Sequence, residues 1–252
     1  ITLRTDDGLH LSIHEAALVD YAGMNLMRGG NGELRALLTP GSPAPVVRRT
    51  PFATPWRTIA ISERAGGLVE SNLILNLNEP NALGDVGWFR PSKYVGVWWS
   101  LHLDKESWAT GPKHGATTAN TKRYIDFAAA HGFRGVLVEG WNVGWDGDWF
   151  ANGWGFDFSK PTPDYDLSAL AKYAGGKGVH LIGHHETACA VSHYERQMDA
   201  AFAKFSSLGI DAVKTGYVCD AGQIERQDTV GGPVLREWHE GQWMSNHHLR
   251  VV

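Results

Sequence analysis

The stretch Val179-His180-Leu181-Ile182-Gly183-His184-His185-Glu186 decides the fold, because it is an apolar run of strand length that ends in ionisable residues. Similar apolar runs lie on both sides of it along the chain, and amphipathic stretches separate them. Continuous apolar strands that alternate with amphipathic helices are typical of a parallel sheet built from βα units. The predicted strands are residues 95–101, 135–139, 179–186 and 212–218, and the predicted helices are residues 117–131, 167–174 and 191–208, with a last helix that starts near Gly241.

Four such units make about half of a (β/α)8 barrel, which needs roughly 250 residues for eight. An open doubly wound sheet is the alternative, but no glycine-rich phosphate-binding turn follows the first strand. We therefore predict an α/β fold over residues 77–252, a partial (β/α)8 barrel of about four βα units.

Residues 1–76 follow a different pattern. Apolar and polar residues alternate with period two in residues 9–13 and 56–61, which predicts half-buried strands. Several prolines between residues 40 and 55 exclude a helix there. We predict the C-terminal part of an N-terminal β-sandwich domain, since the segment is too short to be a whole one.

The composition excludes two classes of partner. The 252 residues carry a formal net charge of −4 and show no basic stripe, so we predict no nucleic-acid partner. No apolar run approaches the roughly 20 residues of a membrane span. Cys189 and Cys219 are too few for a disulfide framework and leave their redox state open. The chain begins without Met and stops inside a predicted helix, so we expect a fragment of a longer protein.

Ionisable side chains gather at the carboxyl ends of the predicted strands, where the active sites of parallel α/β folds lie. Glu139 ends the second strand, and Lys214 lies on the fourth. His184 and Glu186 end the third strand and share one of its faces, because side chains alternate along a strand. His185 is expected to point the other way.

If strand order follows chain order, Glu139 and Glu186 lie on strands about 4.8 Å apart and face one substrate. Lys214 would flank both carboxylates and keep them ionised. Hydrolysis of a glycoside requires two carboxyl groups across the bond, about 6.5–9.5 Å apart for inversion and about 5–5.5 Å for retention. Trp141 and Asn142, in the loop after the second strand, supply an aromatic face and a short polar group that suit a sugar.

The residues alone leave other interpretations open. Glu139 and Lys214 also fit a structural pair that closes the rim of the sheet, and Trp141 and Trp145 also fit a packed lid. A metal hydrolase would use His184, His185 and Glu186, but three residues of one strand cannot converge on one ion. The first strand is expected to end at Ser100 and His102, and core packing is expected for Trp98 and Trp99.

Four ordered motifs carry a family resemblance. Residues 111–118 (GPKHGATT), 138–142 (VEGWN), 183–187 (GHHET) and 213–218 (VKTGYV) together resemble glycoside hydrolase family 97. Residues 14–18 and 20–24 look like the end of that family's N-terminal β-super-sandwich. The resemblance implies an exo-acting α-glycosidase from a mostly bacterial, exported family that is periplasmic or secreted.

The inverting branch of that family consists of calcium-dependent α-glucosidases acting on malto-oligosaccharides. By resemblance, Glu186 would be the general base that positions the attacking water, and Glu139 would line the subsite for the non-reducing sugar. His184 and Lys214 would contact sugar hydroxyls. The retaining α-galactosidase branch places a nucleophilic Asp just after the strand-four Lys, where this chain has Thr215-Gly216. The resemblance therefore favours inversion and an α-glucoside.

This chain has no positions that match the family's second base, general acid or calcium carboxylates. We therefore identify no calcium ligands in it and expect the isolated fragment to be inactive. A retaining α-galactosidase of the same family and a non-catalytic carbohydrate-binding half barrel stay open as alternatives. In either case an oligosaccharide is the predicted partner.

Overall fold

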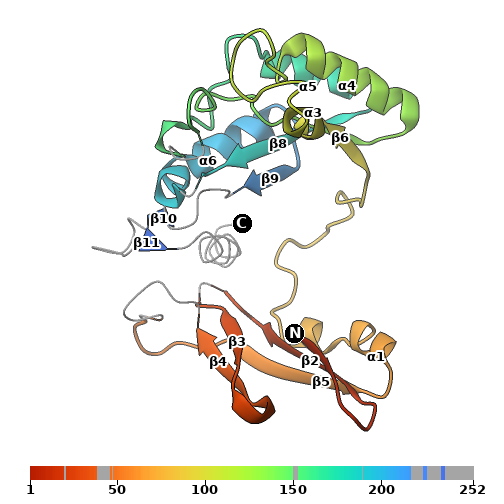
Figure 1. The fold of residues 1–252 in the computed structure, drawn as a ribbon. Helices are drawn as coiled ribbons and strands as arrows, with labels where there is room; N and C mark the ends of the chain where they lie inside the picture. Colours follow the sequence, from red (N-terminus) through yellow and green to blue (C-terminus); the bar gives the residue numbers. More distant parts are fainter. Residues whose placement is uncertain are drawn as a thin grey trace. The chain divides into compact units, whose positions relative to one another are not determined.

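A computed structural model describes residues 1–19, 21–38, 46, 48–149, 153–188 and 190–216, together with two short strands further on. The chain divides into two compact units, and the boundary lies between Trp88 and Phe89. Figure 1 labels the helices and strands of both units. No helix of the described residues has the length and apolar character needed to cross a membrane.

The first unit is built from antiparallel strands, as the period-two pattern predicts. β1 (Thr2–Arg4), β2 (His10–Ala16) and β5 (Trp56–Ser62) form one sheet, with His10 opposite Ser62 and Ala16 opposite Trp56. β3 (Met24–Arg28) and β4 (Leu34–Leu38) form a separate hairpin around the 3-10 turn η1 (Gly30–Gly32). Two short helices, α1 (Ala65–Val69) and α2 (Leu73–Asn76), follow β5 and were not predicted.

β5 presents apolar side chains on the exposed side of its sheet. Ile59 and Ile61 are more than half exposed, whereas Thr58, which lies on the same strand, is buried. A sheet face of this kind is covered by a second sheet in a β-sandwich. The pattern therefore agrees with part of a sandwich, as the sequence predicts for residues 1–76.

The second unit contains the predicted parallel sheet. Its strands are β6 (Tyr94–Gly96), β7 (Gly135–Leu137), β8 (His180–Glu186) and β9 (Val213–Gly216), paired in chain order. The connecting helices are α4 (Thr118–His131), α5 (Leu167–Gly176) and α6 (Val191–Ser207). The 3-10 turn η2 (Gly153–Gly155) lies between β7 and α5. Sequential parallel strands with intervening helices are consistent with part of an α/β barrel.

The helix ends follow the local sequence. The hydroxyl of Thr117 caps α4 by accepting a hydrogen bond from the Asn120 amide, and the helix ends at Gly132 in the left-handed conformation, with φ +70°. The Asp166 carboxylate caps α5 in the same way. Ser/Thr/Asp before a helix and Gly after it are the expected capping residues. Asp166 is therefore a helix cap.

The prediction of one strand over residues 95–101 is wrong. β6 ends at Gly96, and the chain turns directly into the short helix α3 (Trp98–His102). Ser100 and His102 therefore lie on a helix rather than at the end of a strand. Val97 and Leu101, four residues apart, are the buried pair of this segment, which is the spacing of one helix face.

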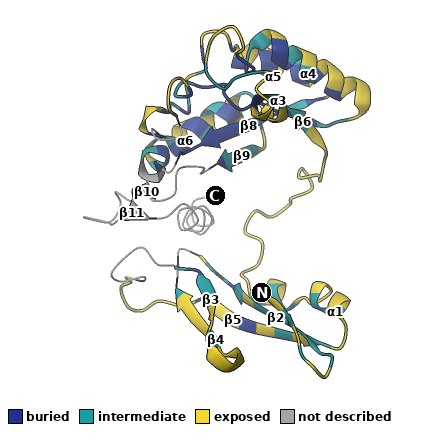
Figure 2. Cartoon of the chain, viewed as in Figure 1, coloured by how far each residue is buried: buried dark blue, intermediate teal, exposed yellow. Residues whose placement is uncertain are grey.

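The core of the second unit surrounds β8, where Figure 2 shows burial concentrated. The sheet contributes Val136 and Leu181, and the helices contribute Ile125, Leu170 and Phe205. A further antiparallel pair, β10 (Ile224–Glu225) with β11 (Val234–Leu235), lies within the stretch after β9. The helix predicted near Gly241 lies outside the described residues.

Candidate active site

β8 sends successive side chains to opposite faces of the sheet. His184 pairs in register with Lys214 of β9, and Glu186 pairs with Gly216. The ring of His185 turns the other way and stacks on Phe205, with a centroid distance of 5.0 Å and an interplanar angle of 11°. The alternation predicted from the sequence therefore separates the two histidines, which cannot bind one ion together.

A buried carboxylate, Glu139, lies two residues beyond the end of β7 and joins three other side chains. Its Oε1 lies 3.0 Å from Lys214 Nζ and 3.4 Å from His184 Nε2. Its Oε2 accepts a hydrogen bond of 3.2 Å from the Trp108 indole. The Lys214 side chain is 45% exposed, so this group reaches the surface of the unit. Figure 1 shows β8 and β9 side by side.

The His184 ring is neutral in this environment. Burial lowers its pKa to about 4; the charge of Glu139 opposes this effect and that of Lys214 adds to it. Nε2 faces the Glu139 carboxylate and therefore carries the proton, which leaves Nδ1 as an acceptor. Nδ1 is buried and has no hydrogen-bond partner among the described residues.

Glu186 lies two residues beyond His184 on β8. Its Oε1 accepts a hydrogen bond of 3.0 Å from the Ala188 amide. A Cβ atom at Gly216 would lie 1.9 Å from its Oε2, so the carboxylate extends over that glycine of β9. Two residues of strand span roughly 7 Å, which separates the level of Glu186 from that of His184 and Lys214.

An aromatic cluster of Trp98, His102, Trp108, Trp145 and Trp149 lies beside Glu139. Trp108 stacks on Trp145 at 6.5 Å, and Trp145 stacks on the His184 ring at 6.0 Å. His102 meets Trp98 at 4.3 Å and Trp108 at 5.1 Å. Trp98 also lies 6.0 Å from Lys214 Nζ. Sequence reasoning missed Trp108 here, because a single loop residue leaves no periodic signal.

The prediction that Trp98 and Trp99 pack in the core is wrong. They are 43% and 61% exposed, because α3 turns only Val97 and Leu101 inward. Trp145, by contrast, is buried and packs against Phe156 at 5.1 Å, so it behaves as a packed lid.

Trp141 and Asn142 are both buried in the loop after β7. The Trp141 indole donates to the His184 carbonyl at 2.8 Å, and its ring contacts Phe205 at 5.4 Å. Asn142 accepts a hydrogen bond of 3.0 Å from Trp145 and donates to two loop carbonyls. This geometry gives both residues a role in holding the loop, and the predicted contact with substrate stays a prediction.

The described residues do not fit a metal site by themselves. No group of three or more His, Cys, Asp or Glu among them is arranged to hold an ion. The calcium predicted from the resemblance stays a prediction. Cys189 and Cys219 lie outside the described residues.

Comparisons with known proteins identify the family. The family model described as Glycoside hydrolase 97 matches residues 98–252, and the one described as Glycosyl-hydrolase 97 N-terminal matches residues 1–80. A glycoside hydrolase family 97 enzyme from Pseudoalteromonas sp. strain K8, solved in complex with acarbose, matches with a TM-score of 0.89 and 55% identity. The match covers 99% of this chain and 38% of that one, and a variant in complex with panose matches equally well.

Two curated relatives are more distant. A retaining alpha-galactosidase of Bacteroides thetaiotaomicron is 25% identical over 84% of this chain and 33% of its own length. A probable retaining alpha-galactosidase of Streptomyces bingchenggensis is 25% identical over 79% of this chain and 28% of its own length. The chain thus spans about a third of the relatives that it matches. Since one family model covers more than half of its residues, the chain belongs to glycoside hydrolase family 97.

Proposed function

We propose that the complete protein containing this chain is an exo-acting, inverting α-glucosidase that hydrolyses malto-oligosaccharides. The 55% identical enzyme was solved with acarbose and with panose, and panose is a trisaccharide of α-linked glucose. The resemblance assigns Glu139, His184 and Lys214 to sugar binding. The Glu139 Oε1 atom lies 3.0 Å from Lys214 Nζ and 3.4 Å from His184 Nε2.

One observation carries the inverting assignment. The Glu186 carboxylate occupies the space that a side chain at position 216 would need. A Cβ atom added to Gly216 would lie 1.9 Å from Glu186 Oε2. The resemblance places the nucleophilic Asp of the retaining branch just after the strand-four lysine, where this chain has Thr215 and Gly216. Gly216 leaves room for Glu186, which supports Glu186 as the residue that handles the attacking water.

The proposed reaction assigns a role to each group. Glu186 takes a proton from a water molecule as that water attacks the anomeric carbon. The bond to the leaving oxygen on the opposite side breaks, which inverts the configuration, and a general acid protonates the leaving oxygen. Lys214 donates hydrogen bonds to sugar hydroxyls and Glu139 accepts them, while His184 contacts a hydroxyl as the resemblance implies. We assign no general acid among the residues that the structure describes.

Calcium and an exported location belong to the proposal as well, on the family resemblance alone. We assign no calcium ligand among the described residues, in which no group of three or more His, Cys, Asp or Glu is arranged to hold an ion. The location has its own test, which is to fractionate the cells that produce the complete protein.

The experiment compares Glu186→Gln with the wild type in the complete protein, using p-nitrophenyl α-glucoside as substrate. We expect turnover to fall about 10²–10⁴-fold, because an amide cannot take the proton. Glu70→Gln is the matched control, since Glu70 pairs with Arg64 on the surface of the first unit. Unchanged turnover in Glu186→Gln would remove this residue from the mechanism.

The stereochemistry of the product tests inversion separately. Proton NMR of the first-formed sugar should show β-glucose from an α-glucoside. If α-glucose forms first, the enzyme retains configuration and the inverting assignment is wrong.

A retaining α-galactosidase is the second candidate, because both curated relatives carry that name. It predicts faster hydrolysis of p-nitrophenyl α-galactoside than of the glucoside, with α-galactose as the first product. The two candidates therefore differ in both the preferred substrate and the first anomer.

A further inference from the structure

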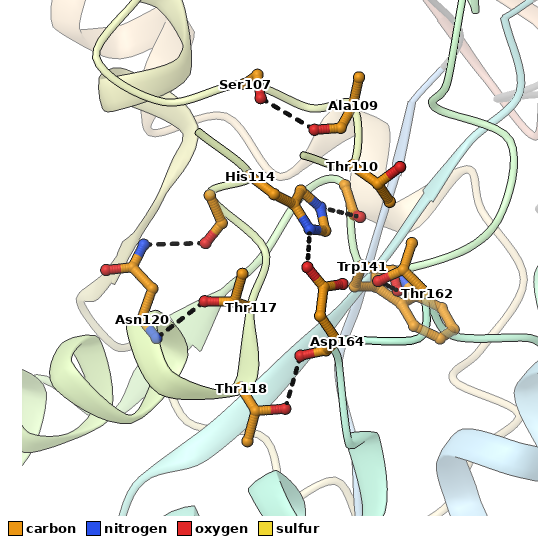
Figure 3. A network of polar contacts seen from close by, with 12 residues as sticks. Ser107, Ala109, Thr110, His114, Thr117, Thr118, Asn120, Trp141, Thr162 and Asp164 are labelled. Atoms are coloured by element: carbon orange, nitrogen blue, oxygen red, sulfur yellow. Dashed lines mark hydrogen bonds and ion pairs between the residues drawn. The ribbon is translucent and has the colours of Figure 1, made fainter. Parts of the chain in front are cut away.

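His114 lies within the 111–118 motif, and the roles proposed above leave it without a function. Its side chain is fully buried. Nδ1 lies 2.8 Å from Asp164 Oδ2 and Nε2 lies 3.2 Å from the Gly140 carbonyl oxygen. Figure 3 shows the ring directed at Asp164. A carboxylate and a carbonyl oxygen can only accept, so each of these contacts is made by an N–H group of the ring.

Asp164 is a fixed anchor for this ring. Burial raises the pKa of its carboxyl, but hydrogen bonds from His114 and Thr162, with the charge of His114, lower it overall. Its backbone carbonyl accepts hydrogen bonds of 2.9 Å from both the amide and the hydroxyl of Thr118, at the start of α4 (Figure 3). The anchor therefore connects the loop before α5 to the first turn of α4.

The other acceptor belongs to the turn that presents Glu139. Gly140 has φ +86°, a conformation that favours glycine, and a Cβ there would lie 3.2 Å from the Trp108 carbonyl oxygen. The next carbonyl, that of Trp141, accepts a hydrogen bond of 2.9 Å from the Thr162 amide. His114 and Thr162 thus bind two consecutive carbonyls of the turn, those of Gly140 and Trp141. The Glu139 carboxylate, which precedes them in the chain, contacts Lys214 and Trp108 instead.

We propose that His114 is a positioning residue for Glu139: its bond to the Gly140 carbonyl fixes the turn that aims this carboxylate at the sugar subsite. The proposal rests on the substrate-binding role proposed for Glu139. His114 itself touches no substrate, so its loss should act through the position of Glu139.

Two substitutions in the complete protein separate the two bonds of the ring. His114→Gln places an amide nitrogen near the position of Nε2 and keeps the bond to Gly140, whereas His114→Asn keeps only the bond to Asp164. We expect Asn to raise KM for p-nitrophenyl α-glucoside about three- to tenfold with kcat changed less, and Gln to stay within about twofold of the wild type. Equal increases in KM for both variants would overturn the proposal.

A double-mutant cycle with Glu139→Gln tests whether the effect passes through Glu139. We expect His114→Asn to add little to KM once Glu139 is Gln. Full additivity of the two effects overturns the positioning role. Glu139→Gln with unchanged KM would instead contradict the proposed substrate role, so the two failures are distinguishable.

A measurement on the wild type covers the case in which His114→Asn does not fold. In the complete protein labelled with ¹⁵N-histidine, the His114 signals are those that disappear in His114→Gln. We expect Nε2 to carry a proton, because it donates to the Gly140 carbonyl oxygen. An unprotonated Nε2 cannot donate to that oxygen, and that result would overturn the proposal.

Discussion

The two faces of β8 differ although neighbouring histidines lie on them. His184 faces Glu139, and its Nδ1 has no partner within the described residues. His185 packs between Phe205 and Tyr194, whose hydroxyl lies 3.0 Å from its Nδ1. Both rings are buried, so burial alone does not distinguish them. The difference lies in the neighbours: His184 shares its face with the charged groups of Glu139 and Lys214, whereas His185 belongs to the packing against α6.

Gly216 and Gly183 show the same contrast between the two faces of the sheet. A Cβ at Gly216 would meet the Glu186 carboxylate, whereas a Cβ at Gly183 would lie 2.3 Å from the Phe205 ring. A substitution of Gly by Ala on either face therefore tests whether catalysis or stability depends on that face. Catalysis should depend on the first and stability on the second.

The largest effect is expected from Gly216→Ala. The new methyl group displaces the Glu186 carboxylate, so kcat on p-nitrophenyl α-glucoside should fall about 10²–10³-fold, approaching the loss of the base itself. The melting temperature should change little, because the displaced group is the end of a flexible side chain. Steady-state kinetics and thermal unfolding of the complete protein measure both. Undiminished turnover would show that Glu186 does not need its present position.

Acid should destabilise the His184 face. The pKa of His184 is about 4 in the folded protein and 6.5 without burial. Between pH 4 and pH 6.5 the folded state therefore binds fewer protons than the unfolded state. Its contribution to stability is present above about pH 6.5 and is lost as the pH falls towards 4, by about 3 kcal/mol in total.

Urea unfolding of the complete protein from pH 7 to pH 4, followed by tryptophan fluorescence, measures this loss. His184→Gln is the reference, because it cannot take up the proton, and its unfolding free energy should decline less over the same range. Parallel curves for the two proteins would contradict the neutral state of His184.

Much of this arrangement could be predicted from the sequence because it follows from strand alternation and chain order. The run 179–186 predicted β8 and the opposite directions of His184 and His185. The position of Lys214 beside His184 follows from pairing neighbouring strands in parallel. Residues of the expected capping types, Thr117, Gly132 and Asp166, lie at the ends of the predicted helices, where local hydrogen bonds need no tertiary contact.

The errors arose where tertiary contacts decide. An apolar run such as 95–101 fits a strand as well as a buried helix, and the i, i+4 spacing of Val97 and Leu101 was the available signal for α3. Trp108 and His114 reach Glu139 and Gly140 from a loop with no period, so their partners are visible only in the fold. The burial of Trp141 and Asn142 depends on the same loop packing.

A smaller effect is expected on the other face, from Gly183→Ala. The methyl group presses on Phe205, and overpacking of a core typically costs about 1–3 kcal/mol. The melting temperature should fall, while kcat per folded molecule at a permissive temperature stays within about twofold of the wild type. A selective loss of kcat, with unchanged stability, would mean that the two faces are not separate.

Tyr194→Phe should have the smallest effect of the four. The substitution removes the hydroxyl that lies 3.0 Å from His185 Nδ1 and leaves the ring contacts with Phe158 and His185 in place. One such hydrogen bond contributes about 1 kcal/mol, so the urea midpoint should shift slightly and KM should not change. Because His185 and His184 are joined by one peptide bond, this is the sharpest test of their separation. A rise in KM would show that a change on the packing face alters the geometry of the face that carries Glu139 and Lys214.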